Sequence, residues 1–169
     1  MIGYSFLDKE RTDAMLPALF AILHANMSAI APTGNSYEKD YEIWRGCVGP
    51  ALQKERRQIV LIRDGDALIG YLQYYTNDSV LMIEEAQLKE PYQNRGIMRG
   101  AFTFLAKYIP REIPFVEAFA HKENLRSRAI LRRLGFKQTE EKENGTTRFR
   151  RDSPTFLARF TQTAEDGAN

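Results

Sequence analysis

The octapeptide QNRGIMRG, residues 93–100, decides how the rest of this chain is interpreted. It follows an apolar run at residues 80–88 and leads into apolar residues at helical spacing, which predicts a strand, a tight turn and a helix. Gly96 stands where the turn enters the helix, so the backbone can approach a ligand closely. The first N–H groups of that helix favour an anion, and Arg95 and Arg99 add positive charge. The stretch therefore predicts a phosphate or pyrophosphate cradle; the alternative is an ordinary turn with solvated arginines.

The spacing Gln-x-x-Gly after an apolar strand resembles the acetyl-CoA signature of the GNAT N-acetyltransferase superfamily. A second block, ENLRSRAILRRLGF at residues 123–136, resembles the second CoA-facing helix of that family and its Leu-Gly-Phe ending. The resemblance covers about residues 2–151 and is strongest over 80–136. It implies an acetyl-CoA-dependent N-acetyltransferase that moves an acetyl group directly to a primary amine, with acetyl-CoA as co-substrate.

Length and composition predict one globular unit. A chain of 169 residues suits a single domain, which we place at residues 1–152, with a partly ordered or frayed C-terminal tail at residues 153–169. Hydrophobic residues make up 43% and charged residues 27%, so neither disorder nor a membrane span is indicated. The charged residues at positions 8–11 do not suit a secretory signal, and we expect a cytoplasmic protein.

Several kinds of partner are disfavoured by residue counts. Cys47 is the only cysteine, so an intramolecular disulfide and a cysteine-based metal cluster are excluded. With only two isolated histidines, His24 and His121, we expect no metal. The net charge of +2 is too mild to predict nucleic acid as the main partner. We therefore expect a monomer or homodimer that binds a CoA thioester and an amine acceptor, and neither nucleic acid nor a membrane.

Hydrophobic periodicity and turn signals predict the element order β-α-α-β-β-β-α-β-α-β-β. The expected strands are residues 2–6, 59–62, 68–75, 80–88, 115–121, 136–143 and 146–151, and the expected helices are residues 13–30, 37–48, 97–108 and 124–134. The connection from 80–88 through a helix to 115–121 should be a right-handed parallel crossover, so the sheet is mixed. The expected fold is α/β, a GNAT-like mixed sheet of about seven strands flanked by about four helices. The superfamily shares this order.

The resemblance implies which residues bind the cofactor. Main-chain groups of Ala86, Gln87 and Leu88 would pair with the pantetheine arm. Amides in the turn and first helical residues would hold the pyrophosphate, namely those of Asn94, Arg95, Gly96, Ile97, Met98 and Arg99. Gln93 matches the first position of the motif, whereas Met98 stands where a glycine or alanine is usual.

The second block supplies further cofactor candidates. Asn124 is suited to cap its helix and also to touch the pantetheine. Arg126 and Arg128 suit the 3′-phosphate end of CoA, with a solvated helix face as the alternative.

The candidate general bases are carboxylates on two strands. Because adjacent strand residues point to opposite faces, we expect only one of Glu84 and Glu85 to reach the cleft. Counting back from Gln93, the resemblance favours Glu85 as the catalytic one. Glu117 on the next strand is a rival that would act through water, and two solvated carboxylates at a strand end are the alternative to any catalytic role.

The usual acid of the superfamily, a tyrosine that assists the leaving thiolate, has no counterpart in this chain. Many members of the superfamily carry a tyrosine four residues before the glycine of Leu-Gly-Phe, where this chain has Leu131. A branch that includes acetyltransferases of ribosomal-protein N-termini has a serine three residues after the asparagine, and Ser127 matches it. Its hydroxyl would donate a hydrogen bond to the developing thiolate. The alternative is a serine on the helix surface.

Two other functions remain open at this level. Leu131 and Met98 motivate a CoA-binding or acyl-CoA-binding domain with little or no catalysis. Four arginines on the helix at residues 124–134 suggest a DNA-reading element, which ranks last because a strand, not a helix, precedes it. The acceptor amine is left open among a polyamine-like metabolite, an antibiotic, an amino acid and a protein N-terminus.

Overall fold

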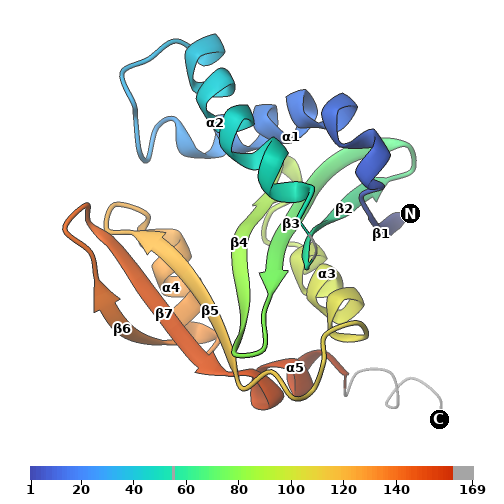
Figure 1. Cartoon of the computed structure of the whole chain (residues 1–169), viewed down its shortest axis with the longest axis vertical. Coiled ribbons are helices and arrows are strands. Elements are labelled where there is room, and N and C mark those ends of the chain that lie inside the picture. The colour runs from blue at the N-terminus through green and yellow to red at the C-terminus, as the bar shows by residue number, and fades with distance from the viewer. Residues whose placement is uncertain (55, 162–169) are drawn as a thin grey trace.

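A mixed seven-stranded sheet runs through the centre of the computed structural model, which describes residues 1–54 and 56–161 (Figure 1). The strands are β1 (Ile2–Phe6), β2 (Arg57–Asp64), β3 (Ala67–Thr76), β4 (Val80–Leu88), β5 (Phe115–His121), β6 (Lys137–Glu141) and β7 (Thr146–Asp152). The helices are α1 (Thr12–Met27), α2 (Tyr37–Leu52), α3 (Ile97–Ala106), α4 (Leu125–Arg133) and α5 (Ser153–Thr161), with short 3-10 turns at Lys9–Arg11 and Glu90–Tyr92.

The strand order is β1-β2-β3-β4-β5-β7-β6, and β4 with β5 is the parallel pair among otherwise antiparallel neighbours. The connection between these two strands passes through α3, as the sequence predicts. The expected α/β fold with a mixed sheet of about seven strands is confirmed.

Alternation along β2 explains why the central strands are buried on both faces. Ile59 and Leu61 point into a core beneath α1 and α2, whereas Val60 and Ile62 point into a larger core that includes α3 and α5. All four side chains are at most 5% exposed. Helices therefore cover both faces of the sheet at β2 and β3. Because β4 pairs with β3, this packing also fixes the position of the C-terminal half of β4.

The C-terminal helix α5 was not predicted. Sequence analysis expected a partly ordered or frayed tail at residues 153–169 and named no helix there, whereas Ser153–Thr161 is helical and packs against α3. The Phe156 ring is fully buried, and its centroid lies 5.5 Å from that of Phe102. Phe160 stacks on Phe102 at 5.3 Å. Residues 162–169 of the expected tail lie outside the described residues.

A close approach between α3 and β1 requires the glycine at position 100. A Cβ built on Gly100 would lie 2.0 Å from the hydroxyl oxygen of Tyr4. That hydroxyl donates to the backbone oxygen of Ile97 at 2.9 Å, so it cannot move away without losing the bond. The helix that begins at the phosphate turn is thus anchored to the first strand of the sheet.

We expect Gly100→Ala to lower the free energy of unfolding by about 1–3 kcal/mol, because the added methyl group displaces Tyr4. Gly46→Ala is the matched control: it also lies inside a helix, it is exposed, and its Cβ would meet nothing within 4 Å. That change should stabilise by about 0.5–1 kcal/mol. Urea denaturation measures both, and equal effects of the two alanines would contradict the close approach.

Candidate active site

The cleft arises where β4 and β5 part. Their parallel register runs from Val80 opposite Phe115 to Ile83 opposite Ala118, and the remainder of β4 pairs with β3 alone. A cavity of about 1230 Å³ occupies this opening. Its walls come from the C-terminal half of β4, the turn and first residues of α3, the end of β5, α4 and the inner side of α1.

Gly96 shapes the phosphate turn, as we call residues 93–99. It has a φ of 75°, which favours glycine, and a Cβ at this position would meet nothing within 4 Å. Gly96 is also the residue just before α3, so the first N–H groups of that helix open onto the cavity that Ile97 and Met98 line. The turn has the shape and polarity of an anion site.

The arginines of the turn are only partly free. Arg95 donates to the backbone oxygen of Pro91 at 3.3 Å, and Arg99 donates to the backbone oxygen of Arg159 at 3.0 Å. Both side chains nevertheless line the cavity. They add positive charge beside the helix N-terminus without filling it.

Two arginines of α4 have different environments. The guanidinium of Arg126 reaches across the cleft and donates to the side-chain oxygens of Gln93 and Asn94 in the phosphate turn. Arg128 points elsewhere: it donates to the Thr147 hydroxyl at 2.6 Å and does not line the cavity. The expected pairing of Arg128 with the cofactor is therefore not supported, because residue 128 faces β7. The other cofactor candidates all line the cavity: Ala86, Gln87, Leu88, Gln93, Asn94, Arg95, Gly96, Ile97, Met98, Arg99, Asn124, Arg126 and Ser127.

A β-bulge in β4 overturns the prediction that Glu84 and Glu85 point to opposite faces. Gln73 pairs with Glu85 and the next residue of β3 pairs with Ile83, so Glu84 is an extra residue without a partner. The side chain of Gln73 donates to Glu84 at 2.9 Å, and Gln73 is also the register partner of Glu85. Both carboxylates therefore lie on the face of Gln73, and both line the cavity.

The two carboxylates have different partners. Arg57 donates twice to Glu84, from Nε at 2.8 Å and from Nη2 at 2.5 Å, in a bidentate pair with both side chains about one-fifth exposed. Among the described residues, Glu85 accepts a side-chain hydrogen bond from the neutral Gln87 amide alone, at 2.7 Å. Desolvation and, to a lesser degree, the charge of Glu84 raise the pKa of Glu85 to about 7, although the bond from Gln87 opposes this. Glu85 is thus the carboxylate whose protonation changes near neutral pH.

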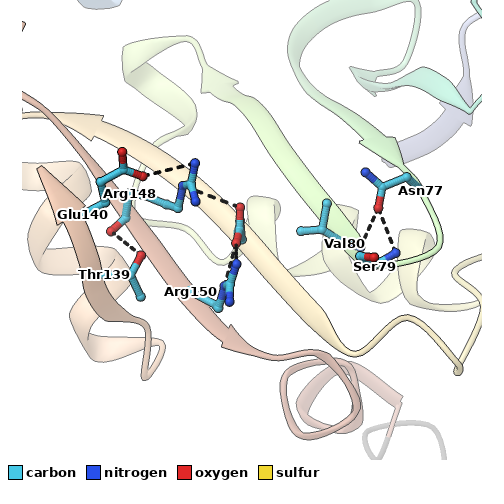
Figure 2. A network of polar contacts seen from close by, with 8 residues as sticks. Asn77, Ser79, Val80, Thr139, Glu140, Arg148 and Arg150 are labelled. Atoms are coloured by element: carbon cyan, nitrogen blue, oxygen red, sulfur yellow. Dashed lines mark hydrogen bonds and ion pairs between the residues drawn. The ribbon is translucent and has the colours of Figure 1, made fainter. Parts of the chain in front are cut away.

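Glu117 on β5 is engaged by arginines of β7. Arg150 donates to it from Nε at 2.6 Å, and Arg148 approaches within 3.9 Å while also pairing with Glu140 at 3.2 Å. Figure 2 shows Arg148 extending from β7 toward Glu140, with Arg150 on the same strand. The Glu117 side chain is 7% exposed and does not line the cavity. These pairings disfavour the rival base.

The turn before β4 is held by its own side chain. The Asn77 side-chain oxygen accepts from the backbone nitrogens of Ser79 and Val80, each at 2.8 Å (Figure 2). This fixes the point at which β4 enters the sheet beside β5.

The start of α4 brings Ser127 to the cavity. Asn124 caps the helix by accepting from the Ser127 backbone nitrogen at 3.0 Å. Ser127 is half-buried and lines the cavity together with Leu131, which supplies no acid.

Sequence reasoning missed the contribution of α1. Its residues Ala18, Ile22 and Asn26 line the cavity, and Asn26 donates to the Gln87 side chain at 2.9 Å and to the backbone oxygen of Leu88 at 3.0 Å. The available signal was the polar Asn26 on the helix face that also carries Ile22.

The family model of the acetyltransferase (GNAT) domain matches residues 10–137, which is most of the chain. The chain belongs to the GNAT acetyltransferase family. No curated protein matches it by sequence.

Solved GNAT-like structures share its fold. An acetyltransferase from Thermus thermophilus is 16% identical with a TM-score of 0.70, over 90% of this chain and 97% of its own. The PaiA N-acetyltransferase of Thermoplasma acidophilum, solved in complex with coenzyme A, is 15% identical with a TM-score of 0.71. The match covers 90% of this chain and 99% of that protein. An acetyltransferase from Salmonella typhimurium that modifies the N-terminal serine of a 50S ribosomal subunit protein is 20% identical with a TM-score of 0.62. The match covers 90% of this chain and 95% of that protein.

Two properties of the described residues bear on membranes and metals. No helix among them is both long and apolar enough to cross a membrane. Within residues 1–54 and 56–161, no three histidine, cysteine, aspartate or glutamate side chains gather as metal ligands would.

The raised pKa of Glu85 makes stability depend on pH. Its ordinary value is 4.5, so between pH 4.5 and about 7 the folded protein holds a proton that the unfolded chain releases. Stability therefore falls as the pH rises through that window. Above it, the desolvated charge costs about 3 kcal/mol.

Glu85→Gln should accordingly raise the free energy of unfolding at about pH 8, by up to about 3 kcal/mol, and change it little at about pH 4. Glu84→Gln is the control, because it weakens the pair with Arg57 and should destabilise at about pH 8. Urea denaturation at both pH values measures this. A Glu85→Gln protein less stable than the wild type at about pH 8 would show that the charge is well solvated or paired.

Proposed function

We propose that this GNAT protein is an acetyl-CoA-dependent N-acetyltransferase that transfers the acetyl group directly to a primary amine. One observation carries the proposal. A single cleft has an anion-binding turn at one end and, on β4, a carboxylate with a pKa of about 7. Direct acyl transfer needs both: a site that holds a phosphorylated donor and a base that takes a proton from an ammonium.

The residues present fit a CoA thioester. Acetyl-CoA supplies the activated acyl group. The open space at Gly96 and the free N–H groups at the start of α3 would receive its pyrophosphate. The edge of β4 beyond Ile83 has no strand partner on the β5 side in the described register, and it would hydrogen-bond the amides of the pantetheine arm.

Glu85 would act as the general base. At neutral pH a carboxyl group with a pKa of about 7 is ionised in a large fraction of molecules and is a stronger base than an ordinary glutamate. It would accept the proton of the acceptor ammonium, directly or through water, before the amine attacks the acetyl carbonyl. Glu84, bound by Arg57, would lie beside it and favour a cationic acceptor.

Ser127 would assist the leaving group. Leu131 provides no phenol, and the hydroxyl of Ser127 opens onto the same cavity. A hydroxyl is a weak acid, so we assign it a hydrogen bond to the developing thiolate and not full proton donation.

The acceptor is a primary amine of a small molecule or of a protein N-terminus. The second class is supported by the Salmonella typhimurium acetyltransferase, which modifies an N-terminal serine. It is also supported by Ser127, which matches the serine of the branch named above, while Leu131 stands at the tyrosine position. We also propose a cytoplasmic location, where acetyl-CoA and both classes of amine would be available.

We predict that Gly96→Asp weakens CoA binding at least tenfold, because it puts a side chain and a negative charge into the phosphate turn. Gly34→Asp is the matched control: its glycine also has a positive φ, 79°, with nothing within 4 Å of a Cβ, but it lies outside the cavity lining. Titration calorimetry with CoA compares the two. Equal affinity of both variants would remove the turn from the proposal.

The decisive assay for catalysis is thiol release from acetyl-CoA with a panel of amines and N-terminal peptides. With the best acceptor, Glu85→Gln should lower kcat/KM at neutral pH about tenfold or more, and the loss should shrink as rising pH deprotonates the amine in solution. Glu84→Gln and Glu117→Gln serve as comparators, because their carboxylates are paired with arginines.

Two outcomes would change the proposal. A pH-dependent loss in Glu117→Gln alone would move the base to β5. Tight CoA binding without thiol release from any amine would instead favour a CoA-binding domain.

A further inference from the structure

An unbroken chain of side-chain amides links the phosphate turn to Glu85. The Gln93 amide nitrogen donates to the Asn26 side-chain oxygen at 3.3 Å. The Asn26 nitrogen donates to the Gln87 side-chain oxygen at 2.9 Å, and the Gln87 nitrogen donates to Glu85 at 2.7 Å. At the far end, the guanidinium of Arg126 donates to the Gln93 side-chain oxygen.

The two ends fix the direction of the whole chain. A guanidinium only donates and an ionised carboxylate only accepts, whereas each amide between them does both. With Arg126 at one end and Glu85 at the other, every amide must therefore point its nitrogen toward Glu85. The backbone oxygen of Leu88 enforces the same orientation, because it accepts from Asn26 at 3.0 Å and from Gln93 at 2.8 Å. Reversing one amide would bring two oxygens together.

We propose that Asn26 is a positioning residue for the transfer reaction: it holds the Gln87 amide so that its nitrogen donates to Glu85, and it ties this orientation to the phosphate turn. The inference rests on the proposed role of Glu85 as the base. Asn26 sets how strongly Glu85 holds its proton without touching the carboxylate itself.

The other groups around Glu85 leave this role to the chain. Titratable residues on this part of the sheet include Glu84 on β4, Arg57 on β2, Tyr71, Tyr74 and Tyr75 on β3, and Glu117 and His121 on β5. Arg57 is bound to Glu84, and Glu117 is bound to Arg150. Burial and the Glu85 charge raise the pKa of Tyr71 well above 10, so it stays neutral. The residues of α1 that line the cavity carry no charge, so Asn26 is the polar contact from that helix.

Asn26→Asp tests the proposal. A carboxylate at position 26 accepts from the Gln87 nitrogen, which reverses that amide and turns its oxygen toward Glu85. The pKa of Glu85, followed by carbon-13 NMR of labelled glutamate in the CoA-free protein, should rise. Ala25→Asp is the control, because it adds the same charge at the neighbouring cavity-lining residue of α1 without joining the chain. We expect the rise in Asn26→Asp to exceed that in Ala25→Asp by about one pH unit.

A Gln87→Leu background supplies the second arm. Without the Gln87 amide, the rise in Asn26→Asp should no longer exceed that in Ala25→Asp by about one pH unit. The proposal would be overturned if the pKa of Glu85 still rose more in Asn26→Asp than in Ala25→Asp in the Gln87→Leu background. It would also be overturned if the two variants raised that pKa equally when Gln87 is present. If Asn26→Asp does not fold, Asn26→Leu is compared with Ala25→Leu by the same criterion. Leucine at position 26 leaves the Gln87 oxygen without its donor, and the pKa of Glu85 is again expected to rise.

The pH profile of turnover gives a readout that a purely structural role would not move. The acidic limb of kcat/KM should shift upward in Asn26→Asp by the amount that NMR gives for Glu85. The NMR arm needs no substrate. The expected pKa shift in a protein that acetylates no amine would therefore contradict the proposed function but not the amide chain. Acetylation of an amine without that pKa shift would reject only the amide chain.

Discussion

The end of pairing between β4 and β5 is the constraint on which the rest of the site depends. Two parallel strands that stay together bury their facing N–H and C=O groups in one ladder, but here the ladder stops at Ile83. Beyond that point β4 is fixed by β3, and β5 is fixed by β7. The opening is stable because each strand keeps a hydrogen-bonded neighbour on its other side. The free edge of β4 then becomes available to a ligand that carries amides of its own.

The bulge in β4 gives the cleft its electrostatic character. One extra residue brings Glu84 and Glu85 to the same face, where two neighbouring carboxylates repel each other. Glu84 is bound by Arg57 in a bidentate pair. Burial is the main cause of the raised pKa of Glu85, and the charge of Glu84 adds to it. A regular strand would have placed one of the two in the opposite core and removed this coupling.

Much of the fold follows from local signals, because they depend on nearby residues alone. The strand, glycine turn and helix around Gly96, the Ser36 cap of α2 and the positive φ of Gly135 are all present where the sequence predicts them. The helix α5 was missed because its burial depends on Phe102, which lies 54 positions before Phe156 and 58 before Phe160. Until Phe102 is placed against them, these two residues look like scattered aromatics.

The sequence by itself determined the family, the element order and the position of the phosphate turn, since each is encoded in a contiguous motif whose spacing is set by helix and strand geometry. Only the tertiary structure decided what the motif residues contact. Arg128 turned to β7, Glu117 was bound by Arg150, and Asn26 came from α1 to complete the amide chain to Glu85. The physical reason is that a bulge depends on the neighbouring strand and that a side-chain bond between elements can join residues far apart in sequence, as the 61 positions between Asn26 and Gln87 show. Periodicity along one segment carries no record of such partners.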